Sequence, residues 1–374
     1  MKQLTLLCTG CVLILSGCKD EADAPLGSCE EIIHGWNLGT YTFPRTQAQQ
    51  DLFFLDERIG FSVGNAGNIL KTDDGGQSWK FLNYSYSLET GFNHDAVTDA
   101  ILQTVFFVNA SVGFVGGDGE HDIFEDIHTD AVFLKTSNGG KDWTKTYIDS
   151  VREIYDLTFF DEKHGMGLFY VRSPDNSGMR QVRTTDDGGE HWTEIVFPEP
   201  RIASFSFVTS PSRIVVETED FLGFSKLWST IDQGKTWQQI HLPTEYVYQI
   251  YFVNDEIAFM DGNPTEFPMG YYKTTDGGVT WVEMDAPFNN WSAIHFRNAH
   301  EGFIINPVYV FIEQGWEGYE MRTSFEGYQT FDGGITWSKS IVGSDCDFEG
   351  IQYSPAGDYF FLLDEPSFQR FERP

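Results

Sequence analysis

One segment of the sequence, from Asp118 to Asp130, is dense in groups that can bind a metal ion. Its candidate ligands are Asp118, Glu120, His121 and Asp122. Carboxylate oxygens suit Ca²⁺ and imidazole nitrogens suit Zn²⁺. The spacing matches neither a 12-residue calcium loop nor a zinc pair one helical turn apart. We therefore favour a solvated acidic loop, and we predict no bound metal and no other cofactor.

Arginines offer a second kind of chemistry. Arg152 and Arg201 each begin a predicted innermost strand, and the two strands are neighbours in the repeat. Guanidinium groups bind carboxylates and phosphates. Together with Arg172 or Arg180 they are candidates for an anion pocket.

Aromatic side chains are a third candidate, because they gather in one long insertion near the C-terminal part of the chain. The candidates are Trp291, Tyr309, Trp316 and Tyr319. Such rings stack on sugars or anchor a protein partner. The alternative is that they pack the insertion onto its neighbour.

These residues must be positioned by a repeat, since the pattern Thr-x-Asp/Asn-x-Gly-x-x-Trp occurs six times. An Asp or Asn side chain that accepts backbone N–H groups closes a tight turn, and the Gly allows positive φ. The Trp then begins the next strand and is buried between sheets. We expect a structural and not a catalytic role for the acid and Trp pairs, which are Asp74 and Trp79, Asn138 and Trp143, Asp187 and Trp192, Asp232 and Trp237, Asp276 and Trp281, and Asp332 and Trp337.

An aromatic strand precedes each of these turns, and a seventh such strand lies near residue 351. Each unit thus reads as four strands, A to D, with period-two alternation and no helical period. We predict an all-β fold, a seven-bladed β-propeller of four-stranded antiparallel blades over residues 31–374. The N-terminal strand that carries Trp36 is expected to complete the last blade, which removes an exposed sheet edge.

The N-terminus reads as an export signal. Residues 1–17 have a basic start and an apolar core, and Leu15-Ser16-Gly17-Cys18 resembles a bacterial lipobox. Cys18 would then carry the lipid, and residues 18–30 would be a tether. Lys19-Asp20-Glu21 resembles the export tag of Bacteroidetes surface lipoproteins. We expect an outer-membrane lipoprotein at the cell surface, with the periplasmic face as the alternative.

Two further cysteines, Cys29 and Cys346, remain in an oxidising compartment. Ring closure would bring both to one blade. We predict a disulfide between them.

The formal net charge of −32 excludes some classes of partner. Such a field repels DNA, RNA and anionic membrane surfaces. We expect a monomer that binds no nucleic acid and meets the membrane only through its lipid.

The turns resemble the Asp-box, or BNR, repeat of sialidases and related β-propellers. The spacing of Phe54 to Trp79, with its Gly64-Asn65-Ala66-Gly67-Asn68 turn, most resembles the photosystem II stability/assembly factor family over about residues 48–342. That resemblance implies a propeller scaffold that is not an enzyme and that binds a protein. The basic patch that this family uses for its client is not evident here.

The resemblance to sialidases implies an alternative function, glycoside hydrolysis. That family uses an arginine triad, a Tyr/Glu pair, an Asp acid/base and an early Arg-Ile-Pro segment. Here Arg201-Ile202 is followed by Ala203, so the segment is absent. We predict a non-catalytic scaffold that binds a protein or glycan through its variable loops at one end of the ring, the upper face.

Overall fold

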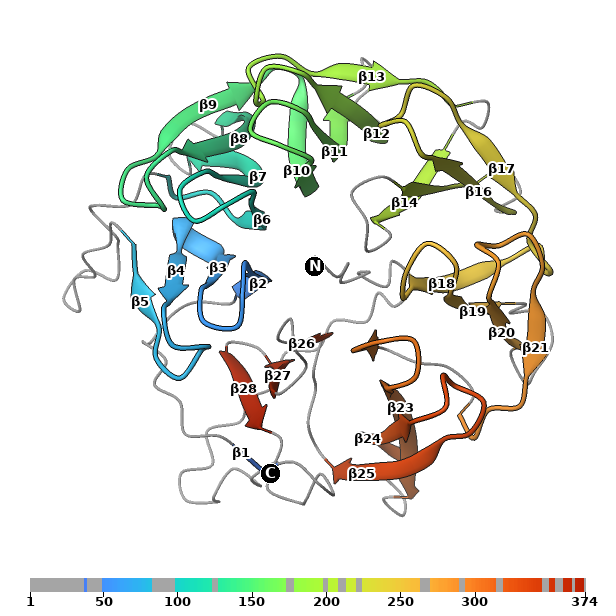
Figure 1. The fold of residues 1–374 in the computed structure, drawn as a ribbon. Coiled ribbons are helices and arrows are strands. Elements are labelled where there is room, and N and C mark those ends of the chain that lie inside the picture. Colours follow the sequence, from blue (N-terminus) through green and yellow to red (C-terminus); the bar gives the residue numbers. More distant parts are fainter. Residues whose placement is uncertain are drawn as a thin grey trace.

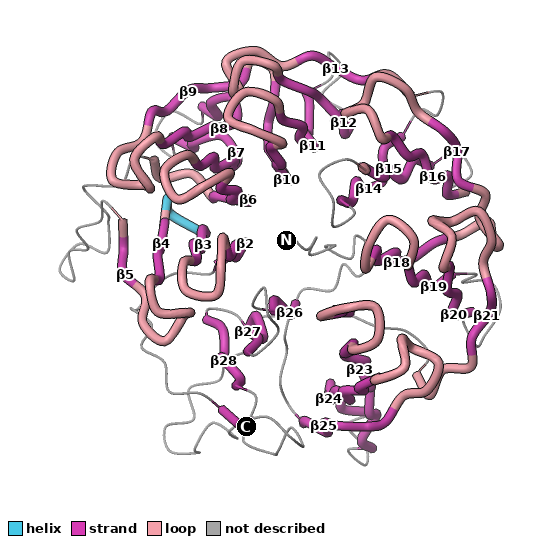
Figure 2. Tube along the Cα trace, viewed as in Figure 1, coloured by secondary structure: helices cyan, strands magenta, loops and turns pink. Residues whose placement is uncertain are grey.

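The structure is a computed structural model. It describes residues 37–38, 49–82, 98–122, 127–172, 178–197, 201–207, 213–219, 224–262, 270–288, 293–313, 319–344, 350–353, 359–364 and 367–372. Among these residues there is no helix long and apolar enough to cross a membrane. The only helical segment among them is the 3₁₀ turn η1, Asn65–Gly67 (Figure 2).

Antiparallel strands follow one another in groups of four, and we number the groups as units. Unit 1 holds β2 (Gln49–Phe54), β3 (Gly60–Gly64), β4 (Ile69–Thr72) and β5 (Lys80–Phe81). Unit 2 holds β6 (Leu102–Phe107), β7 (Gly113–Asp122), β8 (Ile127–Thr136) and β9 (Thr144–Ile148). Unit 3 holds β10 (Val151–Phe159), β11 (Gly165–Arg172), β12 (Gly178–Thr185) and β13 (Thr193–Ile195).

The later units follow the same order. Unit 4 holds β14 (Arg201–Phe207), β15 (Ile214–Glu219), β16 (Ser225–Thr230) and β17 (Gln238–Ile240). Unit 5 holds β18 (Val247–Phe252), β19 (Ala258–Gly262), β20 (Gly270–Thr274) and β21 (Val282–Met284). Unit 6 holds β22 (Ala293–Phe296), β23 (Gly302–Glu313), β24 (Tyr319–Thr330) and β25 (Ser338–Ser344), and the closing unit holds β26 (Gly350–Tyr353), β27 (Tyr359–Asp364), β28 (Ser367–Glu372) and β1 (Asn37–Leu38).

The units surround a central axis and form an all-β propeller (Figure 1). Their first strands lie innermost and their fourth strands lie outermost. The described strands join into six hydrogen-bonded sheets, five of four strands and one of eight. The prediction of seven separate four-stranded blades is therefore wrong.

The physical reason is a bridge between units 2 and 3. Strand β7 continues past its own partner β6 and pairs with β10 at Glu153 and Asp118. This pairing merges both units into the eight-stranded sheet. Strand β7 can reach β10 because it is ten residues long.

The chain's two ends meet in the closing unit. Strand β1 pairs with β28 at Asn37 with Glu372 and at Leu38 with Phe371. The N-terminal strand thus occupies the outer edge of that sheet, although it is two residues long and Trp36 lies outside the described residues.

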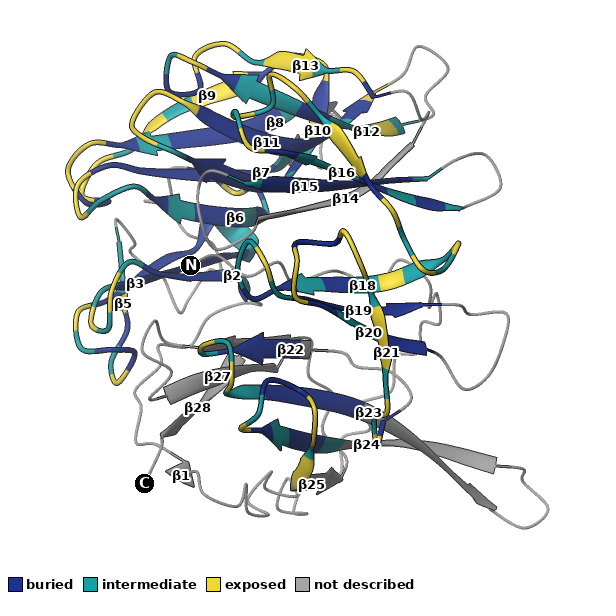
Figure 3. Cartoon of the chain, turned by 45° about the vertical axis from the view of Figure 1, so that its right-hand side comes forward, coloured by how far each residue is buried: buried dark blue, intermediate teal, exposed yellow. Residues whose placement is uncertain are grey.

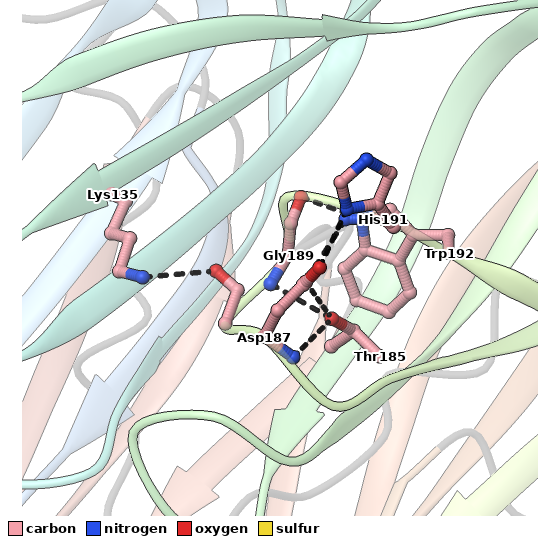
Figure 4. Close-up of polar contacts among 7 residues, drawn as sticks. Lys135, Thr185, Asp187, Gly189, His191 and Trp192 are labelled. Atoms are coloured by element: carbon pink, nitrogen blue, oxygen red, sulfur yellow. Dashed lines mark hydrogen bonds and ion pairs between the residues drawn. The ribbon is translucent and has the colours of Figure 1, made fainter.

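The repeated turn is closed by its Thr as well as by its acid (Figure 4). In unit 3, Gly189 N donates to Thr185 Oγ1 at 2.9 Å, and His191 N donates to Asp187 Oδ1 at 3.0 Å. The acid therefore accepts from the residue four positions on. Trp192 Nε1 donates to the carbonyl of Gly189 at 3.1 Å. Gly188 and Gly189 have φ of 79° and 90°, which an L side chain rarely adopts.

These turns share one end of the ring with the turns between the first and second strands. The bonds that show this are Gly75 N to Arg58 O, Gly139 N to Ser111 O, Gly188 N to Lys163 O, Gly277 N to Glu256 O and Gly333 N to His300 O, at 2.8 to 2.9 Å. We call this end the lower face. The opposite end is the upper face.

Aromatic rings fill the space between neighbouring units. Phe61 of β3 stacks on Phe107 of β6, with ring centres 3.6 Å apart, and Trp143 meets Phe107 edge-on at 6.2 Å. Phe114 and Phe159 repeat the stack at 3.5 Å. Burial is concentrated in these inner and middle strands, whereas the outer strands are exposed (Figure 3). The aromatic strands seen in the sequence are therefore the seams between units.

At the lower face, a Lys or Arg side chain of one unit donates a hydrogen bond to a carbonyl of the next unit in several places. Lys135 Nζ donates to the carbonyl of Gly188 in the next unit at 3.2 Å and lies 5.7 Å from the Phe114 ring centre. Lys273 reaches Gly333 in the same way at 2.6 Å. In unit 4 a Ser occupies the equivalent position, and Arg213 reaches across to Gly277 O at 2.6 Å instead. We call these contacts the cation latches.

Candidate functional site

The inner strands share a feature near the upper face that sequence reasoning missed. In β2, β6, β10, β14 and β18 the pairing with the second strand slips by one residue. A β-bulge of this kind re-aims the extra side chain and is common beside functional sites. The extra residues at equivalent positions are Gln50, Gln103, Tyr155, Ala203 and Tyr248, and β10 slips a second time at Arg152.

A polar residue follows each bulge, and in β2 and β10 its carboxylate accepts backbone N–H groups. Asp51 Oδ1 accepts from Leu52 N at 2.9 Å, and Asp156 Oδ1 accepts from Leu157 N at 2.7 Å. Asp51 Oδ2 also accepts from Val105 N of the next unit at 2.9 Å. The sequence signal was present, since the five residues after the bulges are Asp51, Thr104, Asp156, Ser204 and Gln249.

A group of charged and aromatic side chains lies where β7 meets β10. Its members are Asp118, Arg152, Glu153, Tyr155, Tyr170 and Arg180, and we call them the junction cluster. Glu153 and Asp118 are register partners across the two strands. The Arg180 guanidinium carbon lies 5.2 Å from the Tyr155 ring centre, and the Tyr155 and Tyr170 rings meet edge-on at 6.2 Å.

Burial dominates the protonation of this cluster. It raises the pKa of Asp118 to about 6, although the N–H of Ile101 donates to Asp118 Oδ1 at 2.7 Å and opposes the rise. Burial also raises the pKa of Glu153, and the charge of Asp118 adds to that effect, while Tyr155, Arg152 and Arg180 oppose it. The pKa of Tyr155 rises to about 12, first through burial and then through Glu153. Both carboxyl groups therefore keep their protons to a higher pH than exposed carboxyls do.

The arrangement suits recognition of a ligand that carries both charges. Two carboxylates accept from ammonium or guanidinium donors, two arginines donate to carboxylates, and the rings offer apolar contact. Glycosidases instead divide two carboxyls into a charged and a neutral one. Here the pKa values of both carboxyls move in the same direction.

The structure places only some of the predicted site residues. Arg152 lies exposed in the junction cluster, at the start of β10. Arg201 begins β14 opposite Glu219, and its side chain lies outside the described residues, so a shared anion pocket stays a prediction. Arg180 joins Arg152 in the junction cluster.

For the metal candidates, Asp118 is described and the side chains of Glu120, His121 and Asp122 are not. His121 pairs in register with His128 along β7 and β8. No group of three or more His, Cys, Asp or Glu side chains suited to a metal occurs among the described residues.

The aromatic candidates fall largely outside the described residues. Tyr309 is placed in β23 opposite Thr323, and Tyr319 begins β24 opposite Glu313, but their side chains are not described. Trp291 and Trp316 lie outside the described residues, as do Cys18, Cys29 and Cys346.

No protein-family model matches the chain. One curated relative, photosystem II assembly lipoprotein Ycf48 of Synechococcus sp. (strain CC9902), is 26% identical over 150 residues. The match covers 37% of this chain and 39% of the relative, so the chain spans about two fifths of that relative's length.

Solved structures show the fold. Ycf48 bound to D1 peptide superposes with a TM-score of 0.61 at 19% identity, covering 91% of this chain and 97% of that one. Ycf48 from Cyanidioschyzon merolae gives 0.60 at 16% identity, covering 91% and 99%. The WD40 propeller domain of Doa1 gives 0.51 at 11% identity, covering 91% and 98%. The chain is thus similar to Ycf48 and has a β-propeller fold.

Proposed function

We propose that this chain is a non-catalytic scaffold that binds a protein partner at the upper face, through an extended peptide segment. The junction cluster carries the proposal. It combines two half-buried carboxylates, two arginines and two tyrosine rings that meet edge-on, where β7 and β10 pair in the merged sheet. The similar fold that holds a D1 peptide supports a peptide as ligand.

The net charge of −32 favours a partner segment with basic residues. A Lys or Arg of that segment would meet Asp118 and Glu153, and an acidic residue would meet Arg152 or Arg180. The two tyrosine rings would offer an apolar side chain of the segment a contact surface. A glycan is the second candidate ligand, and sialidase-like or other glycoside hydrolysis is the alternative activity.

Selection of random peptides displayed on phage tests the proposal. We expect enrichment of peptides by the wild-type chain, and loss of their binding by about tenfold or more in a variant with Arg152→Ala and Arg180→Ala. The matched control is Arg297→Ala, since Arg297 pairs with Glu301 at 3.3 Å in a turn of the lower face. Enrichment that is equal for the double variant would contradict the site.

A glycan array and fluorogenic sialosides complete the test. Binding of glycans with no enrichment of peptides would favour the second ligand class. Turnover of a sialoside would contradict the proposal that the chain is a non-catalytic scaffold.

The anchor is a separate part of the proposal. The Leu15-Ser16-Gly17-Cys18 segment supports lipidation of Cys18 and a place in the outer membrane, at the cell surface or on its periplasmic face. Metabolic labelling with a palmitate analogue tests it, and a Cys18→Ser variant should lose the label. Protease treatment of intact cells distinguishes the two faces.

A further inference from the structure

The lower face of units 4 to 6 displays large apolar side chains to solvent. The exposed fractions are 76% for Ile231, 76% for Val279, 61% for Val282, 61% for Phe331 and 60% for Ile335. All five belong to the repeated turns or follow their Trp directly. We call them the lower-face apolar array, and the exposed turns beside β21 and β25 are visible in Figure 3.

The turn itself does not require apolar residues at these positions. Units 1 to 3 build the same turn with polar residues there, namely Asp73, Gln77 and Lys80, Ser137, Lys141 and Thr144, and Asp186, Glu190 and Thr193. The closing hydrogen bonds are alike, since Gly76 N meets Thr72 Oγ1 at 2.8 Å and Gly334 N meets Thr330 Oγ1 at 2.8 Å. The array therefore adds nothing to the closure of the turns.

A concentration of exposed apolar side chains on one face of a folded protein marks an interaction site. The array spans consecutive units of the ring, whereas the same positions in the preceding three units are solvated. This asymmetry gives the lower face one apolar side. A partner that covers it would remove these side chains from water.

The three turns that carry the array hold three carboxylates, Asp232, Asp276 and Asp332, and one cation, Lys235, so negative charge predominates there. Hydrogen bonds from the Thr280 hydroxyl and N–H lower the pKa of Asp276 to about 2, and those from the Thr336 hydroxyl and N–H do the same for Asp332. Both carboxylates are therefore ionised at neutral pH, in the same turns as Val279, Phe331 and Ile335. Negative groups interleaved with apolar ones complement a segment in which Lys or Arg flank apolar side chains.

We propose that the lower-face apolar array is a second docking surface, which binds a protein segment of apolar residues flanked by Lys or Arg. It lies at the end of the ring opposite to the junction cluster. It is therefore independent of the ligand proposed for the upper face. A chain with both surfaces would hold two protein segments at once.

Binding of labelled peptides tests this surface directly. The probes are fluorescein-labelled peptides of about 15 residues in which Leu, Ile and Phe are flanked by Lys, and matched peptides with Glu in place of Lys. The variant carries Ile231→Ser, Phe331→Ser, Val279→Gln, Ile335→Gln and Val282→Thr. Each new residue type already occurs at an equivalent position in units 1 to 3, so we expect the variant to fold. Fluorescence polarisation should show binding of the Lys peptides to the wild-type chain and weakening by about tenfold or more in the variant.

Val196→Thr is the matched control, because Val196 is 82% exposed and lies outside the turns. It should bind the Lys peptides as the wild type does. Equal affinity of the variant and the wild type, equal affinity for Glu peptides, or no binding of Lys peptides by the wild type would overturn the proposal. Association of the wild-type chain with itself or with neutral lipid vesicles, lost in the variant while peptides do not bind, would assign the array to those occupants instead.

Discussion

At the scale of single residues, the Thr of each repeated turn is its central acceptor. Thr274 Oγ1 accepts from Gly278 N at 2.9 Å and lies 2.8 Å from Asp276 Oδ1, to which its hydroxyl donates. The sequence predicted the acid and the glycine, because both have familiar roles in turns. It showed that the Thr recurs but did not reveal its role, because its partner lies four residues away and meets it only once the chain has turned.

We expect Thr274→Val to destabilise the protein. The replacement keeps the shape of the side chain but leaves the buried N–H of Gly278 without its acceptor, which costs about 1–3 kcal/mol. Urea denaturation measures the change in the free energy of unfolding. Thr280→Val is the control, since its hydroxyl meets Asp276 at an exposed position and its loss should cost less. Equal losses in both variants would contradict the role of Thr274.

The raised pKa of Asp118 makes stability depend on pH. In the folded state it is about 6 and the ordinary value is 3.8, so the fold favours the protonated form. This contribution to the free energy of unfolding is complete below pH 3.8 and is lost as the pH rises through about 6.

Asp118→Asn should remove that loss, because an amide oxygen still accepts from Ile101 N and carries no charge. We expect the melting temperature of the variant to exceed that of the wild type more at about pH 7.5 than at about pH 4. Calorimetry at the two pH values measures it. A difference that is the same at both would show that Asp118 titrates normally.

At the scale of the element, the cation latches hold neighbouring units together. Lys273→Met removes the bond to Gly333 O and the cation over the Phe259 ring, whose centre lies 5.5 Å from Nζ. A lost hydrogen bond from a charged group costs about 1.5–3 kcal/mol. Chemical denaturation should show a loss of this order. Lys235→Met, at an exposed turn position, should leave stability nearly unchanged.

The sequence predicted the strands but not the β-bulges within the innermost ones. Alternation and aromatic residues predicted the strands, since one face of each must pack against the next unit. The bulges of the inner strands were missed because the slip depends on which residue of the partner strand accepts each bond. Asp51, Thr104 and Asp156 carried the signal, since each lies directly before the first hydrophobic residue of the buried part of its strand.

At the scale of the whole molecule, the ring depends on the pairing of β1 with β28. Removal of residues 1–38 deletes β1 and exposes the edge of β28. We expect its melting temperature to fall by a few degrees. A variant without residues 1–36 keeps β1 and is the matched control. Equal melting temperatures for the two variants would show that this pairing adds no stability.

The propeller class followed from the repeat, whereas the number of sheets did not. Local sequence specifies each four-strand unit, and the seam residues Phe61 and Phe107 specify the contact between units. Whether two units also share a backbone pair depends on how far β7 extends and on the meeting of Asp118 with Glu153. Neither the sequence of β7 nor that of β10 contains a pattern that predicts this pairing.

The shared pair of β7 and β10 has a mechanical consequence. Two units that share a backbone pair are held together by a further contact besides the side chains packed between them, so we expect them to tilt less against each other than other neighbouring units do. The junction cluster sits on that bridge. A ligand that binds there contacts a rigid part of the ring. We expect relative motion of units to occur at the other contacts between units.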